Sequence, residues 1–203
     1  IGGRKDVESL LQYKKGDWEL KVSNNGKNIS GVINPETCDG SKLGCVTRRD
    51  RSEIASRKLK DVKNVSFNFQ AVGSENLLEN NSGIFYQIKP GGTGGANDGN
   101  NSYIRLAVKN GVVAAGLFGK DPMPIKIKDK KGNDVTIDAK NKNAFEIKIN
   151  DKGKDALYVN GQEALTFNMP KIKDSTNFKI GFETVDKKLK DDFGGSYTDY
   201  TLS

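Results

Sequence analysis

The sequence predicts an all-β protein, an antiparallel β-sandwich or jelly roll. Short runs in which apolar and polar residues alternate recur along most of the chain, as expected for half-buried strands. The dipeptides Asn110-Gly111 and Asn160-Gly161 stand between such runs and are typical of tight hairpin turns, which join antiparallel neighbours. Helical spacing of apolar residues occurs only in Val7 to Tyr13, which we expect to form one short helix or a loop.

The expected strands are short and separated by turn residues. Further turns are predicted at Lys131-Gly132-Asn133-Asp134 and at Asp151-Lys152-Gly153. Many strands at short intervals favour a two-sheet jelly roll, which can bend one sheet into a concave groove. In chain order, we predict strands at Trp18 to Val22, Val65 to Val72, Ile84 to Lys89, Tyr103 to Val108, Val112 to Phe118, Ile125 to Lys128, Ala144 to Ile149, Ala156 to Val159, Ala164 to Phe167, Phe178 to Phe182 and Tyr197 to Leu202.

The segment from Pro90 to Asn101 breaks the strand pattern because it is rich in glycine and poor in apolar residues. We expect a mobile loop there, either a lid over a groove or a long hairpin loop. Its position directly after Gln87-Ile88-Lys89 favours the lid. A phosphate-binding loop is not favoured, since no Gly-Lys-Ser/Thr closes the run and no helix is predicted after it.

Composition is compatible with one domain covering residues 1–203 and with a hydrophobic core, since 34% of the residues are apolar and 29% are charged. The formal net charge of +7 points to an anionic partner: a nucleic acid, an acidic membrane surface or an acidic polysaccharide. For any individual lysine run, a solvated strand face or turn is the favoured interpretation. We expect a monomer.

No stretch is apolar enough for a membrane-spanning helix, and the chain starts at Ile1-Gly2-Gly3 without a signal-like segment. If the protein is secreted or extracytoplasmic, as we expect, its leader has been removed. Cys38 and Cys45 have six residues between them and predict a local disulfide rather than a metal site, because two thiols without a histidine make a poor zinc cage. Free thiols in a cytosolic protein are the alternative.

The chain contains no histidine, which excludes serine triads, cysteine-histidine proteolysis and the usual zinc hydrolases. Carboxylates, lysines and tyrosines are the remaining acid-base candidates, and no cofactor is indicated. Glu53 and Glu183 are a conceivable glycosidase pair. A salt bridge of Glu53 with Arg51 and Lys179 is the simpler interpretation.

Three strand segments carry a family resemblance: Arg51-Ser52-Glu53-Ile54, Gln87-Ile88-Lys89 and Phe178-Lys179-Ile180-Gly181. Their order and spacing resemble the family-7 polysaccharide lyases, the alginate lyases, which show R-S-E-L-R, then Q-I-H or Q-V-H, then Y-F-K-x-G-x-Y-x-Q. The resemblance extends from about Gly31 to the C-terminus and implies a jelly roll with a groove. In this chain Ala55, Lys89 and Glu183 replace the second arginine, the histidine and the last tyrosine of these motifs.

The resemblance implies β-elimination in an anionic uronate polysaccharide, of the alginate or glucuronan type. That reaction requires neutralisation of the uronate carboxylate, removal of the C5 proton and protonation of the leaving oxygen. By position, Arg51 is expected to clamp the carboxylate and Gln87 to hydrogen-bond it or an adjacent hydroxyl. Lys89 has an ordinary pKa of about 10.4, so it neutralises charge unless its surroundings lower that pKa.

A tyrosine base must come from another position, since Glu183 occupies the expected one. Alternation places Tyr86 on the opposite face from Gln87 and Lys89, whereas Tyr103 shares a face with Arg105. The candidate catalytic residues are therefore Arg51, Gln87, Lys89 and Tyr103, and the candidate substrate-binding residues are Glu53, Arg105, Lys179 and Glu183. Half-buried strand packing is the alternative role for Tyr103.

Two classes of function follow. The first is a secreted lyase, or a divergent relative, acting on a uronate polymer. The second is a carbohydrate-binding module that kept the groove and lost the chemistry, motivated by the replacements at Lys89 and Glu183. Nucleic-acid binding rests on charge alone and is ranked last, because Trp18 is the only tryptophan and no basic-aromatic motif occurs.

Overall fold

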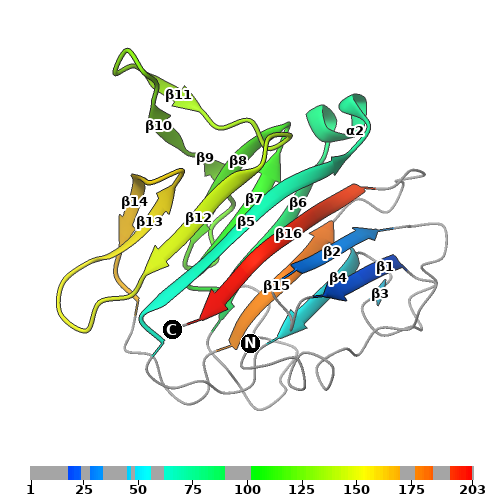
Figure 1. Cartoon of the computed structure of the whole chain (residues 1–203), viewed down its shortest axis with the longest axis horizontal. Helices are drawn as coiled ribbons and strands as arrows, with labels where there is room; N and C mark the ends of the chain where they lie inside the picture. Colours follow the sequence, from blue (N-terminus) through cyan, green and yellow to red (C-terminus); the bar gives the residue numbers. More distant parts are fainter. Residues whose placement is uncertain are drawn as a thin grey trace.

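The computed structural model describes residues 18–23, 28–33, 45–46, 49–55, 62–89, 102–169, 177–184 and 193–202. Within these ranges the strands form two seven-stranded sheets and one two-stranded hairpin, and every pairing is antiparallel (Figure 1). The predicted all-β sandwich of the jelly-roll type is confirmed.

One sheet is centred on β5 and is called the β5 sheet. Its order is β1 (Trp18–Ser23), β2 (Asn28–Ile33), β16 (Phe193–Leu202), β5 (Asn64–Gly73), β12 (Asn143–Lys148), β13 (Asp155–Val159) and β14 (Gln162–Phe167). The other is called the β6 sheet. Its order is β3 (Cys45–Val46), β4 (Arg49–Ala55), β15 (Asn177–Thr184), β6 (Ser82–Lys89), β7 (Ile104–Lys109), β8 (Val112–Leu117) and β9 (Met123–Pro124).

The predicted hairpins form where the turn chemistry requires them. Asn110 and Gly111 join β7 to β8 with φ angles of 50° and 81°, and Asn160 and Gly161 join β13 to β14 with 52° and 80°. Positive φ at both central residues matches the right-handed twist of the flanking strands, and asparagine and glycine adopt it at little cost. These two turns fix the register of both hairpins.

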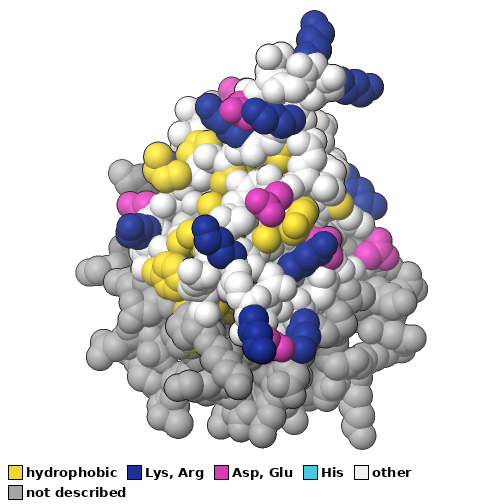
Figure 2. All heavy atoms as spheres, turned by 90° about the vertical axis from the view of Figure 1, so that its left-hand side faces the viewer, with side chains coloured by type: hydrophobic (Ala, Val, Ile, Leu, Met, Phe, Trp, Pro, Cys, Tyr) yellow, Lys and Arg dark blue, Asp and Glu magenta, His cyan; other side chains and the backbone are white. Residues whose placement is uncertain are grey.

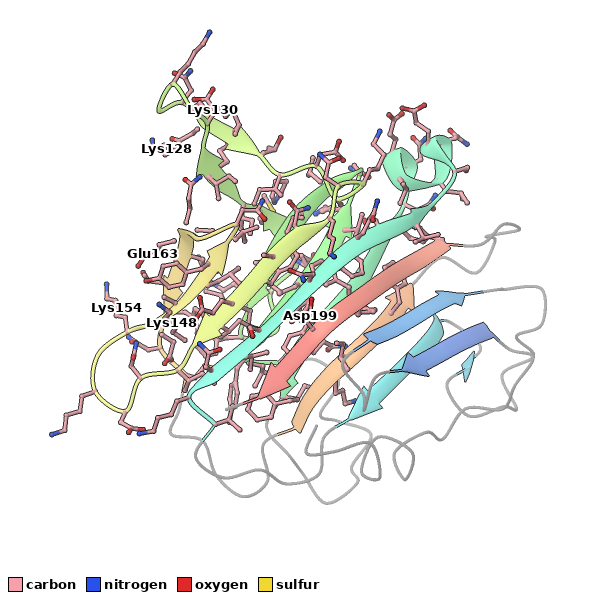
Figure 3. All side chains as sticks on the ribbon, in the orientation of Figure 1. Lys128, Lys130, Lys148, Lys154, Glu163 and Asp199 are labelled. Carbon is pink, nitrogen blue, oxygen red and sulfur yellow. The ribbon has the colours of Figure 1, made fainter. Side chains whose placement is uncertain are left out.

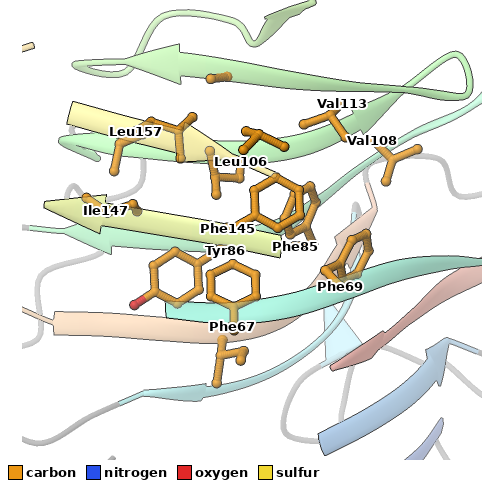
Figure 4. Packing of buried hydrophobic residues seen from close by; sticks show 14 of the residues in the cluster. Phe67, Phe69, Phe85, Tyr86, Leu106, Val108, Val113, Phe145, Ile147 and Leu157 are labelled. Carbon is orange, nitrogen blue, oxygen red and sulfur yellow. The ribbon is translucent and has the colours of Figure 1, made fainter. Parts of the chain in front are cut away.

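The core lies between the two sheets and is rich in aromatic rings (Figure 4). Phe69 of β5 stacks on Phe85 of β6 with ring centroids 4.0 Å apart, and Phe67 lies 4.8 Å from Tyr86. The ring of Phe69 also fills the space above Gly195, where a Cβ atom would lie 2.0 Å from it. Aromatic contacts thus hold the sheets together. Alternation predicted Tyr86 on the face opposite Gln87, and the structure shows that this face is the core.

A β-bulge in β6 sets which of its side chains face away from the core. Phe85 is skipped in the register with both neighbours, β15 and β7, so Phe85 and Tyr86 both enter the core. The hydroxyl of Tyr197, from the β5 sheet, donates to the carbonyl oxygen of Phe85 at 2.8 Å. This bond satisfies a backbone acceptor at the bulge and ties the two sheets together.

Helix α2 (Glu75–Asn80) was not predicted from the sequence. The side chain of Ser74 caps it by accepting a hydrogen bond from the backbone N–H of Leu77 at 3.3 Å. Leu77 and Leu78 are the buried residues of the helix. The helix is short, and a single pair of leucines gives no periodic signal, so only the capping serine could have indicated it.

The hairpin of β10 (Lys126–Lys128) and β11 (Asp134–Thr136) projects from the sheets, with lysines along it and at its tip (Figures 2 and 3). The carboxylate of Asp129 accepts hydrogen bonds from the backbone N–H groups of Lys131 and Asn133. Gln162 of β14 bonds both backbone groups of Lys128 at 2.9 Å. The hairpin is therefore anchored to the sandwich.

The other expected strands appear with ends shifted by a few residues, and β2, β3, β9 and β11 were not predicted. The predicted segments Val7 to Tyr13 and Pro90 to Asn101 lie outside the described residues, as does Cys38, so the helix, the loop and the disulfide stay predictions. The helix in the described part of the chain is too short to cross a lipid bilayer.

Candidate functional site

The β6 sheet brings the three sequence motifs side by side. Arg51 of β4 is the register partner of Glu183 of β15. Lys179 of β15 is the partner of Gln87 of β6, and Gln87 in turn is the partner of Arg105 of β7. Residues more than 120 positions apart in the sequence therefore stand on adjacent strands, as the resemblance implied.

Burial along β15 and β7 shows which positions face away from the core. Phe178, Ile180 and Phe182 of β15 are core residues, and so are Ile104, Leu106 and Val108 of β7. Because successive strand residues point to opposite faces, Lys179 and Glu183, together with Arg105 and Lys109, belong to the other, outer face. This outer face of the β6 sheet carries the candidate site.

Gln87 lies in a buried polar network on this face. Its Nε2 donates to Oε2 of Glu183 at 3.2 Å, and its Oε1 accepts from Oγ of Ser102 at 3.1 Å. Gln87 is 2% exposed, Glu183 is 3% exposed and Ser102 is fully buried. With one bond at the nitrogen and one at the oxygen, the amide has a fixed orientation. Both ends of the amide thus bond protein groups. The expected hydrogen bond from Gln87 to a uronate stays a prediction.

A hollow of about 260 Å³ opens beside this network. Arg105 and Lys109 of β7 line it together with Glu183, Ile84, Asp121 and Pro122. Gln87 is not among the lining residues. Two cations and two carboxylates therefore face the same small space, which is slightly smaller than the roughly 300–1,000 Å³ typical of ligand pockets. The volume suits one ring-sized unit of a ligand.

The segment after β8 forms one wall of the hollow. Lys109 Nζ donates to the carbonyl oxygen of Pro122 at 3.0 Å, which fastens the wall to β7. The close approach depends on Gly116, where a Cβ atom would lie only 2.4 Å from the carbonyl oxygen of Lys120. A glycine in the interior of β8 is thus explained by the backbone that packs against it.

Tyr103 and Arg105 were expected to share a groove face, but the structure does not bring both to the hollow. Tyr103 precedes β7, which begins at Ile104, and its ring packs against the core cluster while Arg105 lines the hollow. Burial raises the pKa of the Tyr103 hydroxyl above its ordinary value of 10.0. A higher pKa keeps the hydroxyl protonated at neutral pH, so less of the phenolate that could take a proton is present.

The remaining candidates are placed as follows. Lys89 is the last residue of β6, is partly buried and pairs with Asn177 of β15. Glu53 is the register partner of Gly181, two residues along β4 from the pair of Arg51 with Glu183. The structure describes Arg51 and Glu53 through their backbone, so the predicted salt bridge with Lys179 stays a prediction.

Sequence reasoning missed Ser102, Lys109 and Asp121. Ser102 follows the glycine-rich segment and gave no motif signal. Lys109 shares the alternation of Arg105 and could have been found from the period of two along β7. Asp121 lies in a loop whose fold over Gly116 no local pattern indicates. Within the described residues, no three cysteine or carboxylate side chains are grouped closely enough to hold a metal ion.

Comparison with known proteins identifies the fold. The structure resembles an alginate lyase from Corynebacterium sp. with a TM-score of 0.60 at 12% identity, covering 94% of this chain and 82% of that one. An alginate lyase from Pseudomonas aeruginosa gives 0.56 at 16% identity, covering 95% and 87%. Alginate lyase AlgAT5 of polysaccharide lyase family 7 gives 0.56 at 15% identity, covering 94% and 85%.

At these identities the likeness establishes a shared fold, a β-jelly roll of the kind seen in family-7 lyases. No family model matches the sequence, and no curated protein sequence matches it.

Proposed function

We propose that the protein binds an anionic, uronate-containing polysaccharide on the outer face of the β6 sheet and does not cleave it. The supporting observation is the buried network of Gln87, Glu183 and Ser102. In the resembling lyases this glutamine is placed near the substrate carboxylate, whereas here its amide is bonded within the protein. The fold, the net charge of +7 and the cations of the hollow support an acidic carbohydrate ligand.

The chemistry available at the hollow favours binding over elimination. The described side chains that line it include an arginine, a lysine and two carboxylates, with no tyrosine among them. Arginine stays protonated at neutral pH and serves as an anchor for a carboxylate rather than as a base. Tyr103, the expected base, is partly buried with a raised pKa.

Cleavage by β-elimination is the second candidate. The observation in its favour is the register that aligns Lys179, Gln87 and Arg105 on three adjacent strands, with Arg51 paired to Glu183. In that case Arg51 and Gln87 hold the uronate carboxylate, and Lys89 or Tyr103 exchanges protons with C5 and the leaving oxygen.

One experiment separates the two candidates. The protein is incubated with alginate and with glucuronan, retention is measured by affinity electrophoresis, and the ultraviolet absorbance of the unsaturated product is followed over a long incubation. Binding that weakens with salt, without product, is expected. Product formation would replace the binding function with the lyase, and the absence of both retention and product with both polymers would defeat both candidates.

A matched pair of variants locates the binding surface. Arg105→Gln removes a cation from the hollow and is expected to weaken binding by about ten-fold or more, as for loss of a hydrogen bond to a charged group. Lys154→Gln makes the same change of charge in the turn between β12 and β13, distant from the β6 sheet (Figure 3). It is expected to change affinity less than two-fold. Equal effects would refute the location.

A further inference from the structure

The turn that follows β8 contains an unusual residue for its backbone conformation. It is closed by a 3.1 Å hydrogen bond from the N–H of Lys120 to the carbonyl oxygen of Leu117. Its two central residues, Phe118 and Gly119, have φ angles of 51° and 78°. A positive φ brings the Cβ atom of a residue close to the following carbonyl oxygen, so bulky side chains rarely adopt it. Phenylalanine is therefore strained in this turn.

Two other described turns of this chain have the same pair of φ angles, and both contain asparagine at the first central position. Asn110 and Gly111 have φ angles of 50° and 81°, and Asn160 and Gly161 have 52° and 80°. Asparagine is the residue that such turns favour there. The turn after β8 thus uses a more costly residue than the same conformation requires. Residues strained in this way cluster at ligand-binding and active sites.

Core packing does not explain why the turn contains an aromatic residue. Phe118 is 48% exposed and is outside the core cluster, against which the preceding Leu117 packs. The N–H of Phe118 donates to the carbonyl oxygen of Tyr103 at 3.2 Å. The next N–H, of Gly119, donates to the carbonyl oxygen of Ser102 at 3.1 Å. These bonds hold the turn through its backbone, so they do not select a phenylalanine side chain.

The turn belongs to the loop that forms one wall of the hollow. After the turn, the chain folds over β8, with the carbonyl oxygen of Lys120 against Gly116. It then continues into Asp121 and Pro122, which line the hollow. Gly116 is the register partner of Arg105, the arginine of the hollow. An exposed aromatic ring is therefore carried at the edge of a small, charged binding space.

We propose that Phe118 is a further ligand-binding residue, whose ring stacks on the sugar unit next to the one held in the hollow. A pyranose carries its polar groups around its rim and C–H groups on its faces, so an aromatic ring that covers a face removes apolar area from water. This inference rests on the proposed polysaccharide-binding function and adds an uncharged subsite to it. The strain in the turn is then the cost of presenting the ring to the ligand.

The test measures two quantities that stacking moves in opposite directions. Phe118→Asn gives the turn its favoured residue, so it is expected to raise the urea unfolding midpoint by about 0.3 M or more. The same variant is expected to bind alginate and glucuronan about five-fold more weakly or worse in isothermal titration calorimetry, because the ring is lost. Phe118→Tyr keeps the ring and is expected to bind within about two-fold of the unaltered protein.

Salt separates this contact from the charged ones. Titrations are repeated at about 50 mM and about 500 mM salt, since salt screens exposed charges and leaves apolar contacts in place. The loss caused by Phe118→Asn is expected to be the same at both concentrations, whereas the loss caused by Arg105→Gln is expected to shrink at the higher one. Val72→Asn is the control, because Val72 is 37% exposed on the β5 sheet, and it is expected to change affinity less than about two-fold.

The outcomes separate this inference from the proposed function. If the unaltered protein binds neither polymer, the proposed function fails and the subsite fails with it. If Arg105→Gln weakens binding but Phe118→Asn does not, the subsite is refuted while the binding function stands. The subsite is refuted in the same way if Phe118→Tyr or Val72→Asn weakens binding as much as Phe118→Asn.

Discussion

The bond between the two sheets at the β6 bulge gives a quantitative prediction. Tyr197→Phe removes the hydroxyl that donates to the Phe85 carbonyl at 2.8 Å in the buried core and changes little else in shape. A buried acceptor that loses its donor costs roughly 1–3 kcal/mol. With a urea m-value of about 2–3 kcal/mol/M, the unfolding midpoint is expected to fall by about 0.3–1.5 M.

Equilibrium urea unfolding followed by tyrosine and tryptophan fluorescence measures this change. Tyr158→Phe is the matched control, because the Tyr158 hydroxyl donates a long, exposed hydrogen bond of 3.4 Å to Glu163. Its effect is expected to stay within about 0.5 kcal/mol, as is usual for surface substitutions. If Tyr197→Phe costs no more than Tyr158→Phe, the bulge carbonyl does not depend on this hydroxyl and the reasoning is wrong.

Three further predictions concern the site and the projecting hairpin. Ser102→Ala removes a donor to the buried amide of Gln87 and is expected to cost about 1–2 kcal/mol in urea unfolding; a loss below about 0.5 kcal/mol would contradict the network. Gly116→Ala is expected to lower the free energy of unfolding by about 1–3 kcal/mol through overpacking, and to weaken alginate binding because the added methyl group displaces the wall formed by Asp121 and Pro122. An unchanged free energy of unfolding would contradict this. The pKa of Asp129 is held below 3.8, first by the hydrogen bond from the backbone of Asn133. Because the folded pKa is lowered, the stabilisation is present above the unfolded pKa of about 3.9 and is lost as the pH falls through the folded pKa. A midpoint at or above 3.8 in an NMR titration of the Asp129 carboxyl group would refute this prediction.

Local patterns predicted much of the strand content because the period of two and the Asn-Gly turns are encoded by neighbouring residues. Asn110-Gly111 and Asn160-Gly161 close hairpins in the predicted positions, with the positive φ angles that such turns require. Helix α2 escaped prediction, because one buried turn with Leu77 and Leu78 gives too few apolar positions to show a period.

The candidate site could be predicted only in part. Alternation placed Tyr86 on the face opposite Gln87, which the structure shows to be the core, and Arg105 lines the hollow. Tyr103 seemed equivalent to Arg105 by the same alternation, but β7 begins after it and its ring packs on the core. The pairing of Gln87 with Glu183 spans 96 positions, and contacts at that separation depend on strand order rather than on any local signal.

The sequence by itself determined the class of fold, the strands and turns that are local in character, the basic charge and the absence of imidazole chemistry. Tertiary structure decided which charged side chains meet. The antiparallel order of β4, β15, β6 and β7 brings distant residues onto one face, and the bulge at Phe85 sets the face to which Gln87 belongs. Burial then gives that amide internal partners, because polar groups removed from water must bond within the protein.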